Sequence, residues 1–185
     1  GSAFTTVPVY YRVNNGTPVM ETIASLPPGT MTYTFATPEV LTVNTDYSFD
    51  FWVNETSDNY HLNDSILNYA FHTSAVVNTF PYLEGFESND GGWYSKGSNN
   101  SWQWGTPAKT IINKAANGTR AWVTSLTGHY KNNELSYLYS PCFDLSGMTQ
   151  PVLSFSHIFQ IEDGLTADYT WVEYSDNGGV TWTRL

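Results

Sequence analysis

Residues 7–26 read VPVYYRVNNGTPVMETIASL and predict a β-hairpin. Residues 7–14 alternate between apolar and polar side chains as a strand does, and residues 18–26 supply the return strand. Asn15 and Gly16 lie between them, and both residue types tolerate the positive φ angles that a tight primed turn requires. The sequence therefore begins its folded part with two antiparallel strands.

Three further strands are predicted over residues 31–38, 46–54 and 65–71. Tyr33 and Phe35 fall on one face of the first of these. Five short strands within the first 80 residues are typical of an immunoglobulin-like sandwich. The composition agrees, since 16% of the 185 residues are aromatic, only 13% are charged, and short aromatic and β-branched runs alternate with Asn, Gly, Asp and Ser. We predict an all-β protein.

The charge and cysteine content exclude several classes of function. The net charge is −10 and only seven residues are Lys or Arg, which argues against binding to nucleic acid or to anionic membranes. Cys142 is the single cysteine, so neither a disulfide framework nor a thiolate metal cluster is predicted. No run of about twenty apolar residues exists, and membrane insertion is not expected.

The succession VYYRVNNGTPV, SLPPGTMTYTF, DYSFDFWV and HLNDSI resembles the small immunoglobulin-like adhesion modules of the CARDB type. These modules recur in large secreted bacterial proteins. The resemblance implies a first domain over residues 1–78 that serves as a spacer or a binding platform and not as a catalyst.

From residue 79 the chain becomes rich in Trp, and the order of its motifs changes. FES, SWQWGTP, SYLYSPCFDLSGMTQPVLSF and EYSDNGGVTWTRL together resemble the MAM-like jelly-roll modules of bacterial surface and type IX-secreted proteins. The resemblance implies a second domain over residues 79–185. Such modules normally continue for several more strands, so we expect an incomplete jelly-roll β-sandwich whose missing strands belong to a longer protein or come from elsewhere.

Residues 174–182, YSDNGGVTW, resemble the Asp-box turn that recurs in sialidases. Ser175 and Asn177 can bond the turn backbone, glycines such as Gly179 accept angles closed to other residues, and Trp182 would pack across the mouth of the hairpin. None of these roles needs a substrate. We predict a structural turn.

A search for catalytic groups gives no coherent active site. There is no Gly-x-Ser-x-Gly elbow, no cluster of arginines and no metal-ligand spacing among the four histidines. The carboxylates at 162–173 cannot be placed on two sides of a sugar. His157 shares a face of a predicted strand with Leu153, Phe155, Phe159 and Ile161, which favours a core histidine. We predict that the chain is not an enzyme.

Calcium is the candidate cofactor, because carboxylate-rich loops supply the hard oxygen ligands that this ion prefers. MAM-like modules resemble one another in carrying an acidic residue just after the first Phe, which here is Glu87. The predicted ligands are Glu87, Asp90, Asp163 and Asp168. The alternative is that these are solvated loop carboxylates.

Carbohydrate is the candidate ligand, because exposed aromatic rings can stack on sugar faces. The predicted contact residues, which fall in polar and turn-rich surroundings, are Trp93, Trp102, Trp104 and Tyr130. The alternative is that Trp102 and Trp104, two residues apart on one strand face, point into the core.

Taken together, the sequence predicts a non-catalytic region of a large secreted or cell-surface bacterial protein. Its role would be adhesion or carbohydrate attachment, with an extracellular glycan or a host or neighbour surface protein as partner and with avidity gained from repetition. One alternative is an accessory region of an extracellular hydrolase such as a glycosidase or a protease. Another is a purely structural spacer.

Overall fold

The computed structural model describes residues 3–161 and 168–185 and confirms the all-β prediction. In these ranges the regular elements are β-strands and one turn of 3-10 helix, η1 (His61–Asn63), with no α-helix. The chain divides into two compact units. The first consists of Gly1–Phe80 with Pro141–Asp144, and the second of Pro81–Ser140 with Leu145–Leu185.

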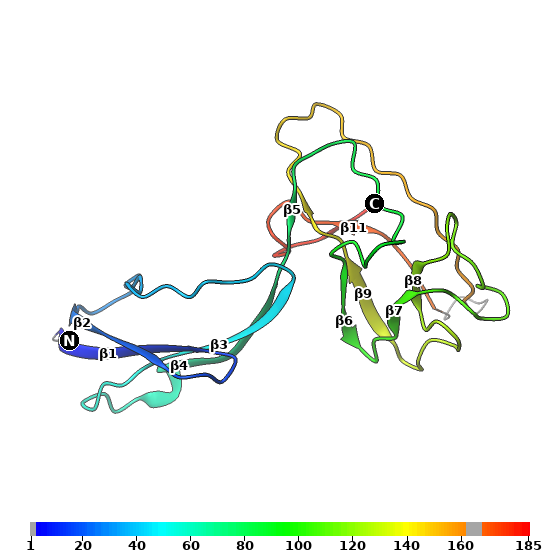
Figure 1. The fold of residues 1–185 in the computed structure, drawn as a ribbon. Coiled ribbons are helices and arrows are strands. Elements are labelled where there is room, and N and C mark those ends of the chain that lie inside the picture. The colour runs from blue at the N-terminus through cyan, green and yellow to red at the C-terminus, as the bar shows by residue number, and fades with distance from the viewer. Residues whose placement is uncertain (1–2, 162–167) are drawn as a thin grey trace. The chain divides into compact units, whose positions relative to one another are not determined.

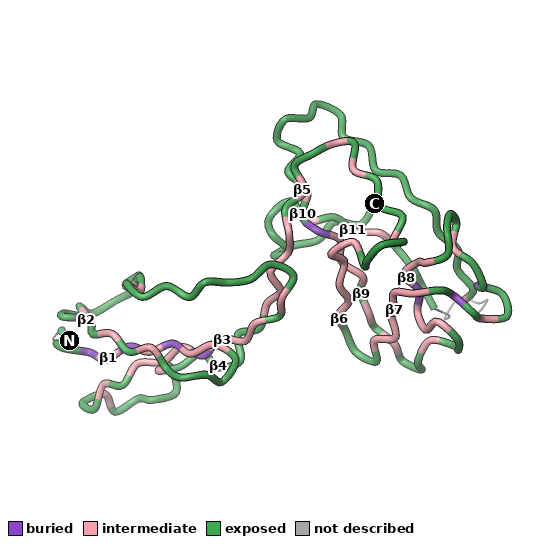
Figure 2. The backbone as a smooth tube through the Cα atoms, viewed as in Figure 1, coloured by how far each residue is buried: buried purple, intermediate pink, exposed green. Residues whose placement is uncertain are grey.

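The first unit is built on one antiparallel sheet of four strands (Figure 1). The strands lie in the order β2-β1-β3-β4. Their bounds are β1 (Phe4–Val13), β2 (Val19–Leu26), β3 (Thr45–Val53) and β4 (Ser65–Thr73). Val7, Val9 and Ile23 form the buried cluster of this sheet, and Figure 2 shows buried positions recurring along β1.

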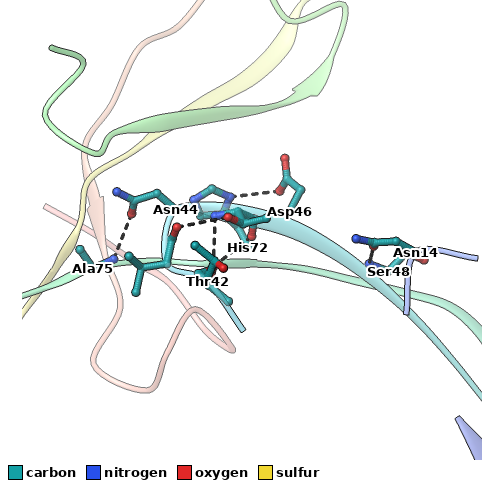
Figure 3. Close-up of polar contacts among 10 residues, drawn as sticks. Asn14, Thr42, Asn44, Asp46, Ser48, His72 and Ala75 are labelled. Atoms are coloured by element: carbon teal, nitrogen blue, oxygen red, sulfur yellow. Dashed lines mark hydrogen bonds and ion pairs between the residues drawn. The ribbon is translucent and has the colours of Figure 1, made fainter. Parts of the chain in front are cut away.

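The turn between β1 and β2 lies one residue earlier than the sequence predicted. Asn14 and Asn15 adopt positive φ values of 48° and 60°, and the amide of Gly16 donates to the carbonyl of Val13 at 2.7 Å. Asn tolerates this left-handed region because its side chain bonds locally. The Asn14 side chain also accepts the amide of Ser48 at 2.9 Å, which ties the turn to β3 (Figure 3).

Residues 31–38 do not form the predicted strand. Their backbone donors go to a carboxylate instead of a neighbouring strand, since Glu21 accepts the amides of Ala36 and Thr37 at 3.0 and 2.9 Å. Glu21 also accepts the hydroxyl of Tyr33 at 2.8 Å. Tyr33 and Phe35 nevertheless pack against the buried cluster. The aromatic pattern thus predicted the packing correctly and the backbone pairing wrongly.

An ion pair between a buried carboxylate and a partly exposed guanidinium marks a bulge between β3 and β4. Asp50 is only 5% exposed and lies 2.6 Å from the guanidinium of Arg12 on β1. Its other oxygen accepts the amide of Asn68 at 2.7 Å, where the strand register shifts and Asn68 has a φ of 56°. The Asn68 amide and then Arg12 hold the pKa of Asp50 below its usual value. The carboxylate therefore joins three strands of the sheet.

Side chains fix the loop that leads into β3 against the end of β4 (Figure 3). Asn44 accepts the amide of Ala75 at 3.1 Å, and the Thr73 hydroxyl donates to the carbonyl of Thr42 at 2.6 Å. Beyond this point β5 (Val76–Val77) pairs in parallel with β10 (Cys142–Phe143). That pairing explains why Pro141–Asp144 groups with the first unit.

The second unit contains three antiparallel pairs among its described residues. β6 (Tyr94–Ser98) pairs with β9 (Leu135–Tyr139), and β7 (Trp102–Gly105) pairs with β8 (Ala121–Thr124). β11 (Glu173–Tyr174) pairs with β12 (Thr183–Arg184) and brackets the Gly-rich turn.

The predicted strand around His157 is not formed. Residues 151–160 have no strand pairing and are exposed (Figure 2), so His157 is not a core histidine. The alternation persists locally, because the His157 ring lies between those of Phe155 and Phe159, with centroids 5.6 and 5.8 Å away. Alternation places side chains on one face, but a strand also needs a neighbouring backbone to bond.

Candidate carbohydrate-binding cleft

A polar cleft of about 240 Å³ opens where β7 begins and β8 ends. Among the described residues that line it, Trp102 is the one with a large aromatic side chain. The described lining residues are Asn100, Ser101, Trp102, Gln103, Ser125, His129 and Lys131. An indole beside several amides and hydroxyls can stack on a sugar ring and bond its hydroxyls.

Backbone pairing and local side chains position Trp102. It stands opposite Thr124 in the β7–β8 ladder, and its amide donates to the Asn100 side chain at 3.0 Å. Beyond β8, the amide of Ser125 donates to the carbonyl of Ser101 at 2.7 Å. Ser125 has a φ of 62°, an uncommon conformation for a residue other than Gly, Asn or Asp. The two strand ends are therefore joined at the cleft.

Glu134 ties the two walls of the cleft together. Its carboxylate accepts the amide of Ser101 at 2.9 Å and the amide of Lys131 at 3.1 Å. It also accepts the hydroxyls of Ser101 and Ser136. Burial raises the pKa of Glu134, but the bonds from Ser101, Ser136 and Lys131 outweigh this and leave the pKa below its ordinary value. The organising group is thus an ionised carboxylate.

The four predicted sugar-binding residues separate into two groups. Trp102 lines the cleft, and Tyr130 lies in sequence between the cleft residues His129 and Lys131 while its hydroxyl bonds Asp168.

Trp93 and Trp104 lie instead around Phe86. The Trp104 indole donates to the Phe86 carbonyl at 2.9 Å, and the Trp93 ring meets the Phe86 ring edge-on at 5.6 Å. The Arg120 guanidinium covers the Trp104 ring at 4.9 Å from its centroid. Trp104 is therefore engaged in packing against its own unit.

Sequence reasoning missed the polar residues of the cleft. Asn100 and Gln103 flank the predicted Trp102, and His129 and Lys131 flank the predicted Tyr130. Their closeness along the chain to the two aromatic residues was the available signal. What the sequence did not show is that residues 100–103 and 129–131 lie side by side.

Glu87 organises a turn. Its carboxylate accepts the amides of Thr119 and Arg120 at 2.8 and 2.7 Å and the Thr119 hydroxyl at 2.9 Å. The Arg120 amide, followed by that of Thr119, lowers the pKa of Glu87. Gly118, with a φ of 67°, lies so close that an added Cβ would be 2.4 Å from the Glu87 Cδ atom. The coordination capacity of Glu87 is therefore largely taken up by backbone donors.

Asp90 and Asp168, two of the other predicted calcium ligands, also have hydrogen-bond partners. Asp90 accepts the amide of Gly92 at 2.9 Å, and Asp168 bonds Tyr130. Asp163 lies outside the described residues. Within residues 3–161 and 168–185, no group of three or more His, Cys, Asp or Glu side chains is placed to hold a metal ion. A calcium site stays a prediction.

The side chains of the 175–182 turn bond within the turn itself. Ser175 Oγ accepts the amide of Gly179 at 2.8 Å, and Asn177 Oδ1 accepts the amide of Thr181 at 3.0 Å. The Trp182 indole donates to the Gly179 carbonyl at 3.1 Å, and its ring meets that of Tyr139 edge-on. Such a self-contained arrangement stabilises the β11–β12 hairpin without a substrate.

Acid should destabilise the protein, because the pKa values of Glu87, Glu134 and Asp50 are all lowered in the fold. A carboxyl group with a lowered folded pKa stabilises the fold fully above its unfolded pKa, which is about 4.5 for Glu, and loses this contribution as pH falls through the folded value. We expect the free energy of unfolding, measured in urea, to be level from about pH 7 to 5 and to fall from about pH 5 to 3.

The variant Glu87→Gln provides the control for this pH dependence. It removes one lowered carboxyl group, so its free energy of unfolding should start lower at neutral pH and fall less steeply in acid. A wild-type stability that stays level or rises between about pH 5 and 3 would contradict the assignment.

The protein is thus all-β, is divided into two units, and has a polar cleft lined in part by Trp102. No family model matches the chain, and no solved structure matches it. The chain is similar to Bacillopeptidase F of Bacillus subtilis (strain 168), with 34% identity over 106 residues. These residues are 57% of this chain and 7% of that protein, so the chain spans less than a tenth of the relative's length.

The described residues contain no helix that is both long and apolar enough to cross a membrane.

Proposed function

We propose that this chain is a non-catalytic accessory region of a large extracellular hydrolase of the peptidase class. The observation that carries the proposal is the similarity over 106 residues to a protein whose name denotes a peptidase, of which those residues make up only 7%. A match of this size is what an accessory region shared between longer proteins gives. The carboxylates of Glu87, Asp90 and Glu134 bond turns and strand ends of their own unit, which is a structural use of these groups.

The accessory role we propose for the cleft is carbohydrate binding. Trp102 offers a ring on which a pyranose can stack, and the amides of Asn100 and Gln103 with the hydroxyls of Ser101 and Ser125 offer both donors and acceptors. The cleft is small, so each contact is weak. Binding to a polymer with many equivalent sugars would raise the overall affinity by avidity.

Two measurements on the isolated chain test this function. The chain should bind at least one member of a panel of immobilised polysaccharides, and Trp102→Ala should weaken that binding by about tenfold or more. Trp104→Phe is the matched control, because Trp104 lies outside the cleft lining. The chain should also leave casein uncleaved. Casein cleavage that survives purification, or binding that Trp102→Ala does not change, contradicts the proposal.

A second candidate function is adhesion within a cell-surface protein, which the resemblance to CARDB-type and MAM-like modules favours. The same cleft would then attach the surface to a glycan. The two candidates differ in the remainder of the polypeptide, and peptidase activity of the longer protein is expected only for the accessory region of a hydrolase.

A further inference from the structure

Positive charge is concentrated in one stretch of this acidic chain. Residues 91–133 contain no Asp or Glu, although the whole chain has a net charge of −10. The same stretch carries five of the seven basic residues, namely Lys96, Lys109, Lys114, Arg120 and Lys131. All seven residues of the cleft lining fall within it. The cleft is thus built from the one long segment of the chain that has a positive charge balance.

Lys131 is the lysine among the described residues that line the cleft. Its ammonium group donates to the Asn100 carbonyl at 3.3 Å, which uses one of three N–H donors. His129 lies two residues away on the same wall. None of the lining residues within 3–161 and 168–185 is acidic. The Gln103 carbonyl already accepts the amide of Leu126 at 2.8 Å, so this side chain has its amide donors to offer.

The nearby carboxylate of Glu134 is held by donors of the cleft walls. Its oxygens accept bonds from Ser101, Ser136 and the Lys131 amide. The Lys109 ammonium bonds the Thr124 carbonyl; burial lowers the pKa of this lysine, and its attraction to Glu134 raises it by less. The attraction between Lys109 and Glu134 offsets part of the Glu134 charge, and Lys131 adds a second positive charge at the cleft.

We propose that the cleft binds an acidic saccharide, with a sugar ring on Trp102 and the sugar carboxylate at the ammonium group of Lys131. This inference rests on the proposed carbohydrate-binding function and names the ligand class. A uronic acid has a flat apolar ring face that can stack on Trp102. It also has a carboxylate on the ring that can accept a hydrogen bond from Lys131. Unlike a simple anion, it would need both Trp102 and Lys131.

The test compares acidic oligosaccharides with their own methyl esters. Fluorescently labelled tetramers from polygalacturonate, alginate and hyaluronan keep their rings on esterification but lose their charge. We expect at least one acid form to bind about tenfold more tightly than its ester at low salt, and this ratio to fall as salt screens the ammonium. In Lys131→Gln the ratio should approach one, while Trp102→Ala should weaken both forms.

Lys114→Gln is the matched control, because it removes the same charge from the 91–133 stretch but does not line the cleft. It should keep the wild-type ratio. Equal binding of acids and esters would overturn this inference and leave carbohydrate binding intact. A Lys114→Gln effect as large as that of Lys131→Gln would overturn the assignment to the cleft. If the chain binds neither acidic nor neutral saccharides, the proposed function is overturned as well.

Discussion

Gly97→Ala is expected to unfold the second unit or to destabilise it by about 3 kcal/mol or more. Gly97 lies in β6 opposite Ser136 of β9 with a φ of 125°, a conformation that other residues rarely adopt. An added Cβ would lie 2.1 Å from the Leu135 carbonyl oxygen and 2.6 Å from the Ser136 Cα atom. Both are backbone atoms of a paired strand, so they cannot move aside without breaking the β6–β9 ladder.

Urea unfolding followed by Trp fluorescence measures this effect. Six of the seven Trp residues belong to the second unit, so the signal reports mainly on that unit. Gly85→Ala is the matched control, because nothing lies within 4 Å of its added Cβ. Its free energy of unfolding should stay within about 0.5 kcal/mol of wild type. Equal losses in the two variants would show that close packing at Gly97 is not the cause.

Glu134→Ala is expected to have the next largest effect, a loss of about 2–3 kcal/mol in the free energy of unfolding. Removal of the carboxylate leaves the amides of Ser101 and Lys131 and the hydroxyls of Ser101 and Ser136 without their acceptor. The walls of the cleft would also be held less firmly, because this carboxylate bonds both and only weaker links such as that from Lys131 to the Asn100 carbonyl would remain. Saccharide binding should therefore weaken in the fraction of the protein that remains folded.

Urea unfolding and saccharide titration at a temperature well below the transition separate these two effects. Glu134→Gln should show smaller losses in both, because a carboxamide keeps one acceptor oxygen. Glu173→Ala removes a carboxylate from β11, where none of the cleft lining lies, and should leave saccharide binding unchanged. Wild-type binding in folded Glu134→Ala would contradict the role assigned to Glu134.

Short-range patterns predicted the local structure best. The β1–β2 hairpin follows from alternation and an Asn-rich turn, both properties of neighbouring residues. The strands expected at 31–38 and around His157 had the same alternation but are not formed. In the first case Glu21, ten or more residues earlier, takes the backbone donors, and in the second no neighbouring strand pairs with residues 151–160.

The candidate site depended on contacts between distant residues, which the sequence did not reveal. Trp102 and Trp104 have the same surroundings in sequence, but only Trp104 reaches the Phe86 carbonyl and lies under Arg120. The sequence predicted no role for Glu134, because its partner Ser101 is 33 residues away along the chain. Glu87 was predicted as a calcium ligand from its position after Phe86, but the sequence did not show that its oxygens contact the Thr119 and Arg120 amides.

The indole N–H resonances of the seven Trp residues give the most direct test of the cleft. Each Trp gives one indole signal in a ¹H–¹⁵N correlation spectrum, so a titration with the acidic tetramers identifies the ring that meets the sugar. We predict that the Trp102 signal shifts progressively and saturably. The signals of Trp104 and Trp122, whose indoles bond the carbonyls of Phe86 and Asp90, should stay in place. Shifts at Trp104 or Trp122 with a stationary Trp102 signal would contradict the account.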